Sequence, residues 1–441
     1  MNWTLPQDVI NILNTLNQQG FPAYAVGGCV RDMFLNRTPQ DWDITTAAPP
    51  DVILSAFPKT VPTGLAHGTV TVLLPGGQYE VTTFRVDGIY EDHRKPESVT
   101  FTDNICEDLA RRDFTMNAMA YHPETGLVDP FGGREDIEKK LIRCVGDPLV
   151  RFDEDALRML RAVRFSAQTG FIVHEDILVA MKQLAPLLSA ISGERIRDEL
   201  MKTLLSDRPA HIELLHETGL LSVILPELDR CFSVSQKIKY HIFDVGHHSL
   251  KALENTPKDP VIRLAALLHD IGKPDKKTTD ENGINHFKGH DLVSADLADG
   301  ILSRLRFDNK TKEQVTCLIR FHDRRFVLTK KCIRRAIAAI GEELFPKLVD
   351  LQRADNYGQN PEFLAERLKH HEHVMALYDE IISGGDALTV KHLAIGGNDL
   401  LAMGYKGKDI GNALSKALEL VLDDPTKNEK NVLINFLKNL D

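Results

Sequence analysis

The pattern of apolar and polar residues changes along this chain, from a mixture of strand and helix periods to a helical period alone. In the N-terminal third, short strand-like runs are mixed with helical ones. FPAYAVGG (21–28) has the pattern of a strand that enters a glycine turn, CVRDMFLN (29–36) that of a helix, and WDITTA (42–47) that of a second strand. In HGTVTVLLPGGQYEVTTFRV (67–86) two alternating runs flank Pro-Gly-Gly, which predicts a β-hairpin. These patterns predict a small α/β or α+β domain.

From Asp147 onward the strand pattern fades and a helical period takes over. Residues 147–170 predict a helix that ends at Gly170, and residues 191–205 predict another. On the second helix, Arg195 and Glu199 have the spacing of an i,i+4 ion pair. The fold class expected from these patterns is α+β, with a sheet-containing head followed by a long helical body.

Length and composition narrow the class of protein. A chain of 441 residues is too long for one ordinary core, so two to four domains are expected. It has 43% apolar and 26% charged residues, and no apolar run approaches the roughly 18 residues that span a bilayer. The start MNWTLPQDVI lacks the regions of a signal peptide, and the six cysteines are scattered. We therefore expect no membrane segment and a reducing, cytoplasmic location.

The net charge does not decide whether the protein binds nucleic acid. The net charge of −10 does not favour an RNA partner, but RNA binding needs only one basic surface. The run RFHDRRFVLTKKCIRR (320–335) holds seven Lys and Arg residues. It is consistent with a solvated helix face as well as with an RNA contact.

The chemistry of the head centres on two aspartates. If Asp41 and Asp43 lie on one strand, their side chains point to the same face and repel each other unless a cation lies between them. Oxygen-only ligation favours Mg²⁺, although two aspartates near a strand end also occur by chance. Upstream, a glycine pair precedes Arg31, a combination suited to phosphate.

Downstream, Arg112 and Asp113 are followed by Asn117 in RRDFTMNAM. These side chains offer charged and hydrogen-bonding groups for a ribose or a phosphate. The alternative is a surface ion pair at a helix start, which contributes little to stability.

A third group recurs every three residues in EDALRMLRAVRF: Asp155, Arg158, Arg161 and Arg164. On one helix these side chains would be neighbours, and a salt-bridged helix face is the simplest interpretation. A second interpretation is that Asp155 and Arg158 act together on a nucleobase. A carboxylate accepts and a guanidinium donates, so the pair would fit C and A and reject U and G.

The motifs in this order resemble those of class II tRNA nucleotidyltransferases, the family of CCA-adding enzymes and bacterial poly(A) polymerases. The matching segments are YAVGGCVRDMFL, QDWDIT, VTTFRVDGIYEDHRKPESV, RRDFTMNAMAY, LVDPFGG, EDALRMLRAVRF and ERIRDEL. The resemblance implies a small nucleotidyltransferase α/β head with a mixed sheet, followed by a mostly α-helical neck, body and tail. The expected domains are a head (1–142), a helical neck that binds nucleotide and RNA (143–235), an HD-type helical domain (236–360) and a helical tail (361–441).

The resemblance also implies roles for single residues. Asp41 and Asp43 match the catalytic Mg²⁺ ligands, and Glu80 matches a further carboxylate near the metals. The segment from Arg85 to Pro96 matches a flexible loop needed to add the terminal A. The residues that match nucleotide-binding positions are Gly28, Arg31, Arg112, Asp155, Arg158, Arg161 and Arg164.

A second set of residues, in the body, resembles an HD-type phosphohydrolase domain. It comprises His248, His269 and Asp270 in LAALLHDIGK, His290, His322 and Asp355. The proposed ligands of a divalent transition metal are His248, His269, Asp270 and Asp355, because His and Asp ligation suits such an ion. The alternative to a metal site is a degenerate HD-type domain that keeps the fold and binds no metal.

The function expected from the resemblance is template-free addition of the 3′-terminal CCA to tRNA from CTP and ATP, with Mg²⁺ as cofactor. Two alternatives stay open at the level of sequence. One is an A-adding enzyme or a poly(A) polymerase, which would use the same head. The other is an HD-domain phosphohydrolase in which the head only binds its ligand. The oligomeric state is not determined by the sequence.

Overall fold

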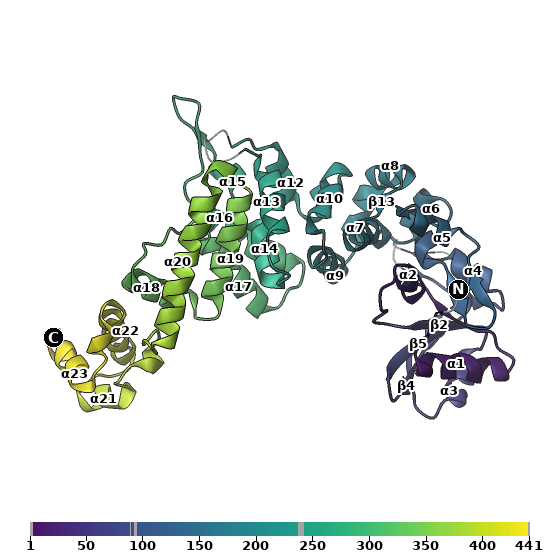
Figure 1. The fold of residues 1–441 in the computed structure, drawn as a ribbon, viewed down its shortest axis with the longest axis horizontal. Helices are drawn as coiled ribbons and strands as arrows, with labels where there is room; N and C mark the ends of the chain where they lie inside the picture. Colours follow the sequence, from purple (N-terminus) through teal and green to yellow (C-terminus); the bar gives the residue numbers. More distant parts are fainter. Residues whose placement is uncertain (1–2, 89, 92–94, 237–241, 440–441) are drawn as a thin grey trace. The chain divides into compact units, whose positions relative to one another are not determined.

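The computed structural model describes residues 3–88, 90–91, 95–236 and 242–439. The chain forms two compact units, residues 1–226 and residues 227–441, drawn in Figure 1 from purple at the N-terminus to yellow at the C-terminus. The first unit contains a sheet and a group of helices, whereas the second is almost wholly helical. This is the expected α+β class, with the sheet in the N-terminal part.

A seven-stranded sheet in the order β11-β10-β1-β2-β5-β4-β3 forms the head. Its strands are β1 (Ala23–Val26), β2 (Asp43–Thr46), β3 (Thr60–Gly64), β4 (Thr69–Leu74), β5 (Gly77–Thr83), β10 (Ala120–His122) and β11 (Gly126–Val128). Strands β2 and β5 are parallel and the other neighbours are antiparallel, so the sheet is mixed as expected. The predicted hairpin is confirmed, because Leu74 pairs with Gly77 across a two-residue turn.

Short helices and two-stranded ribbons surround the sheet. The helices are α1 (Gln7–Gln18), α2 (Gly28–Phe34), α3 (Pro50–Ala56), α4 (Ile105–Ala110) and α5 (Gly133–Glu138). The ribbons pair β6 (Arg85–Asp87) with β9 (Val99–Phe101), β7 (Tyr90–Glu91) with β8 (Lys95–Pro96), and β12 (Leu141–Ile142) with β13 (Ile172–Val173). Helix α1 packs on the sheet because Val9, Ile12, Leu13 and Leu16 recur at helical spacing and are all buried.

The rest of the first unit is helical. It comprises α6 (Pro148–Glu154), α7 (Leu157–Thr169), α8 (Glu175–Leu184), α9 (Gly193–Leu204), α10 (Glu213–Glu217) and α11 (Leu220–Ile224). Gly170 ends α7 in the left-handed conformation at φ 75°, as predicted. The single helix predicted over residues 147–170 is wrong, because Asp155 adopts φ −141° and ψ 103° and separates α6 from α7. Asp155 therefore does not share a helix with Arg158.

Helices of the second unit pack around their own core. They are α12 (Pro226–Asp229) at the division between the units, then α13 (Val245–Glu254), α14 (Pro260–Leu268), α15 (Lys273–Lys276), α16 (His290–Arg304), α17 (Asn309–Phe321), α18 (Lys330–Ile340), α19 (Leu344–Tyr357), α20 (Leu364–Ser383), α21 (Gly397–Ala402), α22 (Lys408–Asp423) and α23 (Lys430–Lys438). A small ribbon pairs β14 (Thr278–Thr279) with β15 (Asn285–His286). None of the described helices combines the length and the apolar character that a bilayer crossing requires.

The C-terminal helices α21 to α23 share a separate apolar cluster that includes Leu400, Val421 and Leu433. Four cations of the basic run at 320–335 form ion pairs within the second unit. These pairs are Lys330 with Glu380, Lys331 with Asp423, Arg334 with Asp386 and Arg335 with Asp423. Much of this run therefore has an intramolecular role.

Candidate active site

Three carboxylates meet at the parallel pair of strands. Asp43 is the first residue of β2 and pairs in register with Glu80 of β5, so both side chains lie on one face of the sheet. Asp41 lies just before β2, so the prediction that both aspartates lie on one strand is wrong. Both aspartates are exposed.

The electrostatics of these carboxylates fit a divalent cation. Although Asp43 is exposed, the protein atoms around its carboxylate displace part of the water there and raise its pKa; Arg112 opposes this shift, whereas Glu80 and Asp41 add to it. Three neighbouring carboxylates repel one another, and a cation bound between them offsets this repulsion. An all-oxygen donor set is the kind that Mg²⁺ prefers.

A glycine turn brings cationic side chains to the same part of the head. Gly27 has φ 79°, and a Cβ there would lie 3.1 Å from Nη1 of Arg112, so glycine allows both the turn and the close approach of this arginine. Gly28 begins α2, which carries Arg31. Arg31 Nη1 donates to Oδ1 of Asn117 at 2.8 Å, which joins the glycine motif to the RRDFTMNAM segment.

The aromatic ring of Phe165 gathers three arginines from two helices. The guanidinium carbons of Arg31, Arg161 and Arg164 lie 5.1, 5.4 and 4.1 Å from its centroid. Burial lowers the pKa of Arg164 to about 10; Glu199 opposes this, whereas Arg161 and Arg31 reinforce it. The grouping of three guanidinium groups around one ring, rather than this pKa shift, is what suits a polyanionic ligand.

All three of these arginines also form ion pairs. Arg31 Nη2 lies 2.8 Å from Oδ1 of Asp32. Arg161 Nη2 lies 2.6 Å from Oδ2 of Asp113, and Arg164 Nε lies 3.1 Å from Oε2 of Glu199. Asp113 is buried and follows the end of α4, so the interpretation of RRDF as a surface ion pair at a helix start is wrong. The predicted pair between Arg195 and Glu199 is wrong as well, because Glu199 faces Arg164.

The proposed base-reading residues have other partners in the structure. Oδ2 of Asp155 lies 2.9 Å from Nη2 of Arg195 on α9, and Oδ1 accepts a hydrogen bond from the Leu157 amide at 3.2 Å. Arg158 forms an ion pair with Glu154. In the described part of the chain no side-chain contact joins Asp155 to Arg158, and their joint action on a base stays a prediction.

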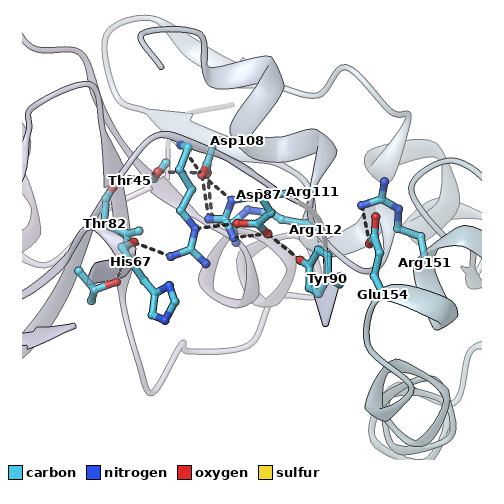
Figure 2. Close-up of polar contacts among 12 residues, drawn as sticks. Thr45, His67, Thr82, Asp87, Tyr90, Asp108, Arg111, Arg112, Arg151 and Glu154 are labelled. Atoms are coloured by element: carbon cyan, nitrogen blue, oxygen red, sulfur yellow. Dashed lines mark hydrogen bonds and ion pairs between the residues drawn. The ribbon is translucent and has the colours of Figure 1, made fainter. Parts of the chain in front are cut away.

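A buried carboxylate that the sequence did not single out supports Arg112. Asp108 lies 2.8 Å from Nη2 of Arg111 and 3.4 Å from Nη2 of Arg112, and its Oδ2 accepts from Oγ1 of Thr45 at 3.2 Å. Figure 2 shows Asp108 among these side chains, beside Asp87. The available signal was a carboxylate three residues before Arg111 and four before Arg112 in ICEDLARR, because this spacing places Asp108 one helical turn from both arginines.

The described part of the segment matched to a flexible loop contributes β6, β7 and β8 to two short ribbons. Residues 89 and 92–94 of this segment lie outside the described residues. Tyr90 donates its hydroxyl hydrogen to Oδ2 of Asp87 at 2.7 Å (Figure 2). Nη2 of Arg158 lies 3.4 Å from the same hydroxyl oxygen. The segment therefore contacts an arginine from the EDALR motif.

The second unit brings the six HD-type residues to one place. They lie mostly at helix ends: His248 within α13, His269 and Asp270 directly after α14, His290 at the start of α16, His322 directly after α17 and Asp355 within α19. Two trios have ligand atoms within 4.8 Å of one another, namely His248, His269 and Asp270, and Asp270, His290 and His322. Asp355 joins the first trio, because its Oδ1 lies 2.8 Å from Nε2 of His248.

Hydrogen bonds orient all four imidazoles toward the carboxylates. Each Nδ1 lies within hydrogen-bond distance of a backbone carbonyl oxygen: Gly358 for His248, Ala266 for His269, Phe287 for His290 and Ile319 for His322. Each Nε2 then points toward the other residues of the cluster, which is the arrangement of metal-bound histidines. His248 and His269 face Oδ2 of Asp270, whereas His290 and His322 face Oδ1.

This donor set fits a divalent transition metal. Asp270 is buried, and neither of its oxygens has a hydrogen-bond partner of good geometry, although Nζ of Lys273 lies 2.6 Å from Oδ2. Burial opposes a charge on His269, but Asp270 and Asp355 raise its pKa to about 10. The cluster thus favours a positive charge between its carboxylates, which is what a metal ion supplies.

Comparisons with known proteins match the chain in three segments. The matched families are the poly(A) polymerase head domain over residues 23–143, the probable RNA- and SrmB-binding site of polymerase A over residues 170–232, and the HD domain over residues 238–359. CCA-adding enzymes of Geobacillus thermodenitrificans and Geobacillus stearothermophilus are 53% and 51% identical over 223 residues. The chain spans 55% of the length of these two relatives, and the match covers 50% of the chain.

Solved structures extend the similarity over the whole chain. The crystal structure of the Bacillus stearothermophilus CCA-adding enzyme in complex with CTP has a TM-score of 0.75 and 30% identity, over 99% of this chain and 98% of that one. The Thermotoga maritima CCA-adding enzyme complexed with tRNA shares the fold at 20% identity, with a TM-score of 0.59. The 30% identity over almost the full length of the Bacillus stearothermophilus enzyme shows that the two chains belong to one family. The chain belongs to the family of class II tRNA nucleotidyltransferases, which includes CCA-adding enzymes and poly(A) polymerases.

Proposed function

We propose that this chain adds the 3′-terminal CCA to tRNA from CTP and ATP without a nucleic-acid template. The observation that carries this proposal is the group of Arg31, Arg161 and Arg164 around Phe165. Each of these guanidinium groups pairs with a carboxylate, but a guanidinium has five N–H donors, and such donors grouped in a partly desolvated place suit the oxygens of a triphosphate. The relative of known structure that binds CTP is similar over its whole length, which supports a nucleoside triphosphate as the ligand.

In the proposed reaction the tRNA 3′-hydroxyl attacks the α-phosphate of CTP or ATP, and pyrophosphate leaves. Asp41 and Asp43 are the proposed catalytic residues and Mg²⁺ ligands, with Glu80 as a third carboxylate on the neighbouring strand. Bound Mg²⁺ would lower the pKa of the attacking hydroxyl and stabilise charge on the leaving oxygens. The arginines neutralise and orient the triphosphate, and such positioning supplies most of the catalysis in phosphoryl transfer.

The proposed nucleotide-binding residues come from both halves of the first unit. They are Gly28, Arg31, Arg112, Asp155, Arg158, Arg161 and Arg164. Asp155 is the proposed acceptor for the amino group that C and A share. The tRNA would be recognised mainly through its backbone and shape, as is usual for structured RNA.

The proposal also includes the domain boundaries of the chain and its location in the cell. The head (1–142), neck (143–235), HD-type domain (236–360) and tail (361–441) are proposed as functional domains of a cytoplasmic tRNA-processing enzyme. Of the described residues, 3–88, 90–91 and 95–142 belong to the head, which holds the three carboxylates.

The decisive experiment offers three tRNA substrates with single nucleotides. Purified protein is incubated with tRNA that lacks CCA, tRNA that ends in C and tRNA that ends in CC, each with one of the four NTPs. CCA addition requires two C residues and then one A, with no further extension. An A-adding enzyme extends only the CC end, and a poly(A) polymerase continues past one A. These alternatives are less favoured, because the relatives of known name are CCA-adding enzymes.

We further propose that the HD-type cluster holds a divalent transition metal and hydrolyses a phosphoester. The supporting observation is that four Nε2 atoms and two carboxylates face each other, with both oxygens of Asp270 buried. Bound metal would supply an activated water at neutral pH. The test is the metal content of the purified protein, followed by hydrolysis of bis-p-nitrophenyl phosphate with and without a chelator. This second proposal is contradicted if the purified protein contains no metal and does not hydrolyse the phosphodiester after loading with Mn²⁺, Ni²⁺ or Zn²⁺.

A further inference from the structure

A chain of hydrogen bonds connects helices α19 and α20 beside the HD-type cluster. Nη1 of Arg367 on α20 donates to Oδ1 of Asn356 on α19 at 3.3 Å, and Nδ2 of Asn356 lies 2.8 Å from Nε2 of His371 on α20. The two helices pack side by side (Figure 1). Asn356 directly follows Asp355, a proposed metal ligand, so these side chains are neighbours of the cluster.

The direction of these hydrogen bonds fixes the tautomer of His371. A guanidinium only donates, so the oxygen of Asn356 faces Arg367 and its amide nitrogen faces His371. The amide nitrogen is a donor, so Nε2 accepts, and the proton of the neutral imidazole lies on Nδ1. Burial, with His370 and Arg353 nearby, also lowers the pKa of His371 to about 4, which keeps the ring neutral near pH 7.

Nδ1 of His371 is therefore a buried donor without an acceptor. The residue is 8% exposed, and none of the described residues accepts a hydrogen bond from this nitrogen. The four imidazoles of the HD-type cluster differ, because each of their Nδ1 atoms has a backbone carbonyl oxygen as its partner. A buried N–H without an acceptor destabilises the protein, so this group calls for a ligand or an ordered water.

The charges around His371 favour an anion as the missing partner. The ring centroid of His370 lies 5.8 Å from that of His371. The guanidinium groups of Arg353 and Arg367 oppose a positive charge on the His371 ring; the carboxylate of Asp355 has the opposite effect but belongs to the proposed metal site. Arg353 is exposed and Arg367 is half-buried, so these cations border on solvent. Phosphoryl oxygens match an N–H donor that lies beside such cations.

We propose that His371 is the anion-binding residue of a phosphate subsite between α19 and α20. Its Nδ1–H donates to a phosphoryl oxygen of the phosphoester that the HD-type cluster hydrolyses. Asn356 is a positioning residue, because its amide holds the ring in the tautomer that presents this donor. The inference rests on the proposed hydrolysis for the identity of the substrate, whereas binding of a phosphoryl group at His371 does not require bound metal.

The first test uses two amides that replace different nitrogens of the ring. An asparagine amide lies near the position of Nδ1 and a glutamine amide near that of Nε2. His371→Asn therefore keeps the donor for the ligand, whereas His371→Gln keeps the contact with Asn356 and loses that donor. His373→Gln is the matched control, because His373 is exposed on the same helix.

Inorganic phosphate is the probe, added to the full chain after a chelator has removed bound metal. Its binding is followed through the ¹⁵N imidazole resonances of His370, which report on this place and not on the arginines of the head. We expect the Kd to rise about ten- to a hundredfold in His371→Gln, much less in His371→Asn, and not at all in the control. The reverse order of the two variants, or wild type that binds no phosphate here, would overturn the proposal.

A second test needs no variant and so does not depend on how well the variants fold. In wild type labelled with ¹⁵N-histidine, His371 should give the spectrum of a neutral ring with its proton on Nδ1. Added phosphate should shift the Nδ1 resonance more than the Nε2 resonance. A proton on Nε2, or an Nδ1 resonance that saturating phosphate leaves unchanged, would overturn the proposal.

Hydrolysis of bis-p-nitrophenyl phosphate separates this inference from the proposed activity of the cluster. In metal-loaded protein we expect His371→Gln to raise KM about ten- to a hundredfold with a smaller change in kcat, and His371→Asn to restore most of the loss. Phosphate binding that depends on His371 in a protein without hydrolysis would contradict the proposed hydrolysis and keep the anion site. Hydrolysis with the same KM in wild type and His371→Gln would contradict the role of His371 alone.

Discussion

Arg161 and Asp113 form an ion pair that joins helix α7 to the segment after α4. Nη2 of Arg161 lies 2.6 Å from Oδ2 of Asp113, and the carboxylate also accepts from the Phe114 amide at 2.8 Å. Burial opposes the ionised form of Asp113, but Arg161 and these hydrogen bonds lower its pKa to about 2. The pair therefore holds Arg161, one of the three arginines around Phe165, in place against the segment after α4.

This pair predicts an acid-dependent stability. Because the pKa of Asp113 is lower in the folded state than in the unfolded state, its contribution is present above about pH 4 and is lost as pH falls toward 2. Asp113→Asn should lower the free energy of unfolding at pH 7 by on the order of 2–3 kcal/mol. The difference from wild type should shrink below pH 4. Urea unfolding at several pH values measures it, with Asp198→Asn, on the exposed face of α9, as the control.

Removing either head aspartate should abolish nucleotide addition. Asp41→Ala and Asp43→Ala each remove a proposed metal ligand at the reacting phosphate, and neither is expected to contact the body of the tRNA. Single-turnover addition of C to tRNA lacking CCA, together with tRNA binding, measures the two effects separately. Asp51→Ala, an exposed carboxylate of α3, should retain full activity. Near-normal turnover of Asp43→Ala with Mg²⁺ would contradict the assignment.

The arginine group around Phe165 should act on all nucleotides alike. Arg164→Ala removes a cation proposed to serve the triphosphate, a part that CTP and ATP share. We expect kcat/KM to fall about ten- to a hundredfold for both nucleotides, the range of one charge-assisted hydrogen bond, with the CTP to UTP ratio unchanged. Lys202→Ala is the control, because Lys202 lies 4.0 Å from the same Glu199 and is mostly exposed. A change in base preference would place Arg164 near the base instead.

The HD-type cluster should be independent of nucleotide addition. Asp270→Asn and His269→Ala should remove bound transition metal and any phosphohydrolase activity, because Asp270 belongs to both trios. Metal content after gel filtration and hydrolysis of bis-p-nitrophenyl phosphate provide the readouts. Asp275→Asn, whose carboxylate pairs with Arg230, is the matched control. Loss of nucleotide addition in a folded His269→Ala protein would show that the two sites depend on each other.

Arg334 should hold the C-terminal helices in place. Its Nε donates to the carbonyl oxygen of Leu422 at 2.7 Å, and its Nη1 lies 3.0 Å from Oδ2 of Asp386. Arg334→Ala leaves these acceptors without their cation and should destabilise α22 by about 3 kcal/mol. Hydrogen exchange should show faster exchange in α22 with no change in the sheet. Arg335→Ala, whose side chain is largely exposed, should have little effect.

Several structural features could be predicted from the sequence, because they depend only on residues that are neighbours along the chain. The alternating runs around Pro-Gly-Gly specified the β4–β5 hairpin, and the chain pairs as predicted from Leu74 to Gly77. Gly170 adopted the left-handed conformation expected at a helix end. The resemblance to HD-type phosphohydrolase domains named six residues of the body, and the structure brings them to one place.

Partner choice among charged residues was decided only by the tertiary structure. The spacing of Arg195 and Glu199 predicted a mutual pair, but Glu199 pairs with Arg164 and Arg195 pairs with Asp155. An exposed i,i+4 pair contributes only a few tenths of a kcal/mol, whereas a buried charge needs a partner wherever packing places it. The helix break at Asp155 has a similar origin, since the carboxylate bonds both the Leu157 amide and Arg195 on α9. The sequence by itself determined the family, the residue types of both sites and the hairpin of the head. The packing of α7 against α9 and the head decided which carboxylate each arginine faces. A buried charge without a partner is destabilising, so burial forces a pairing that the spacing of residues along one helix does not reveal.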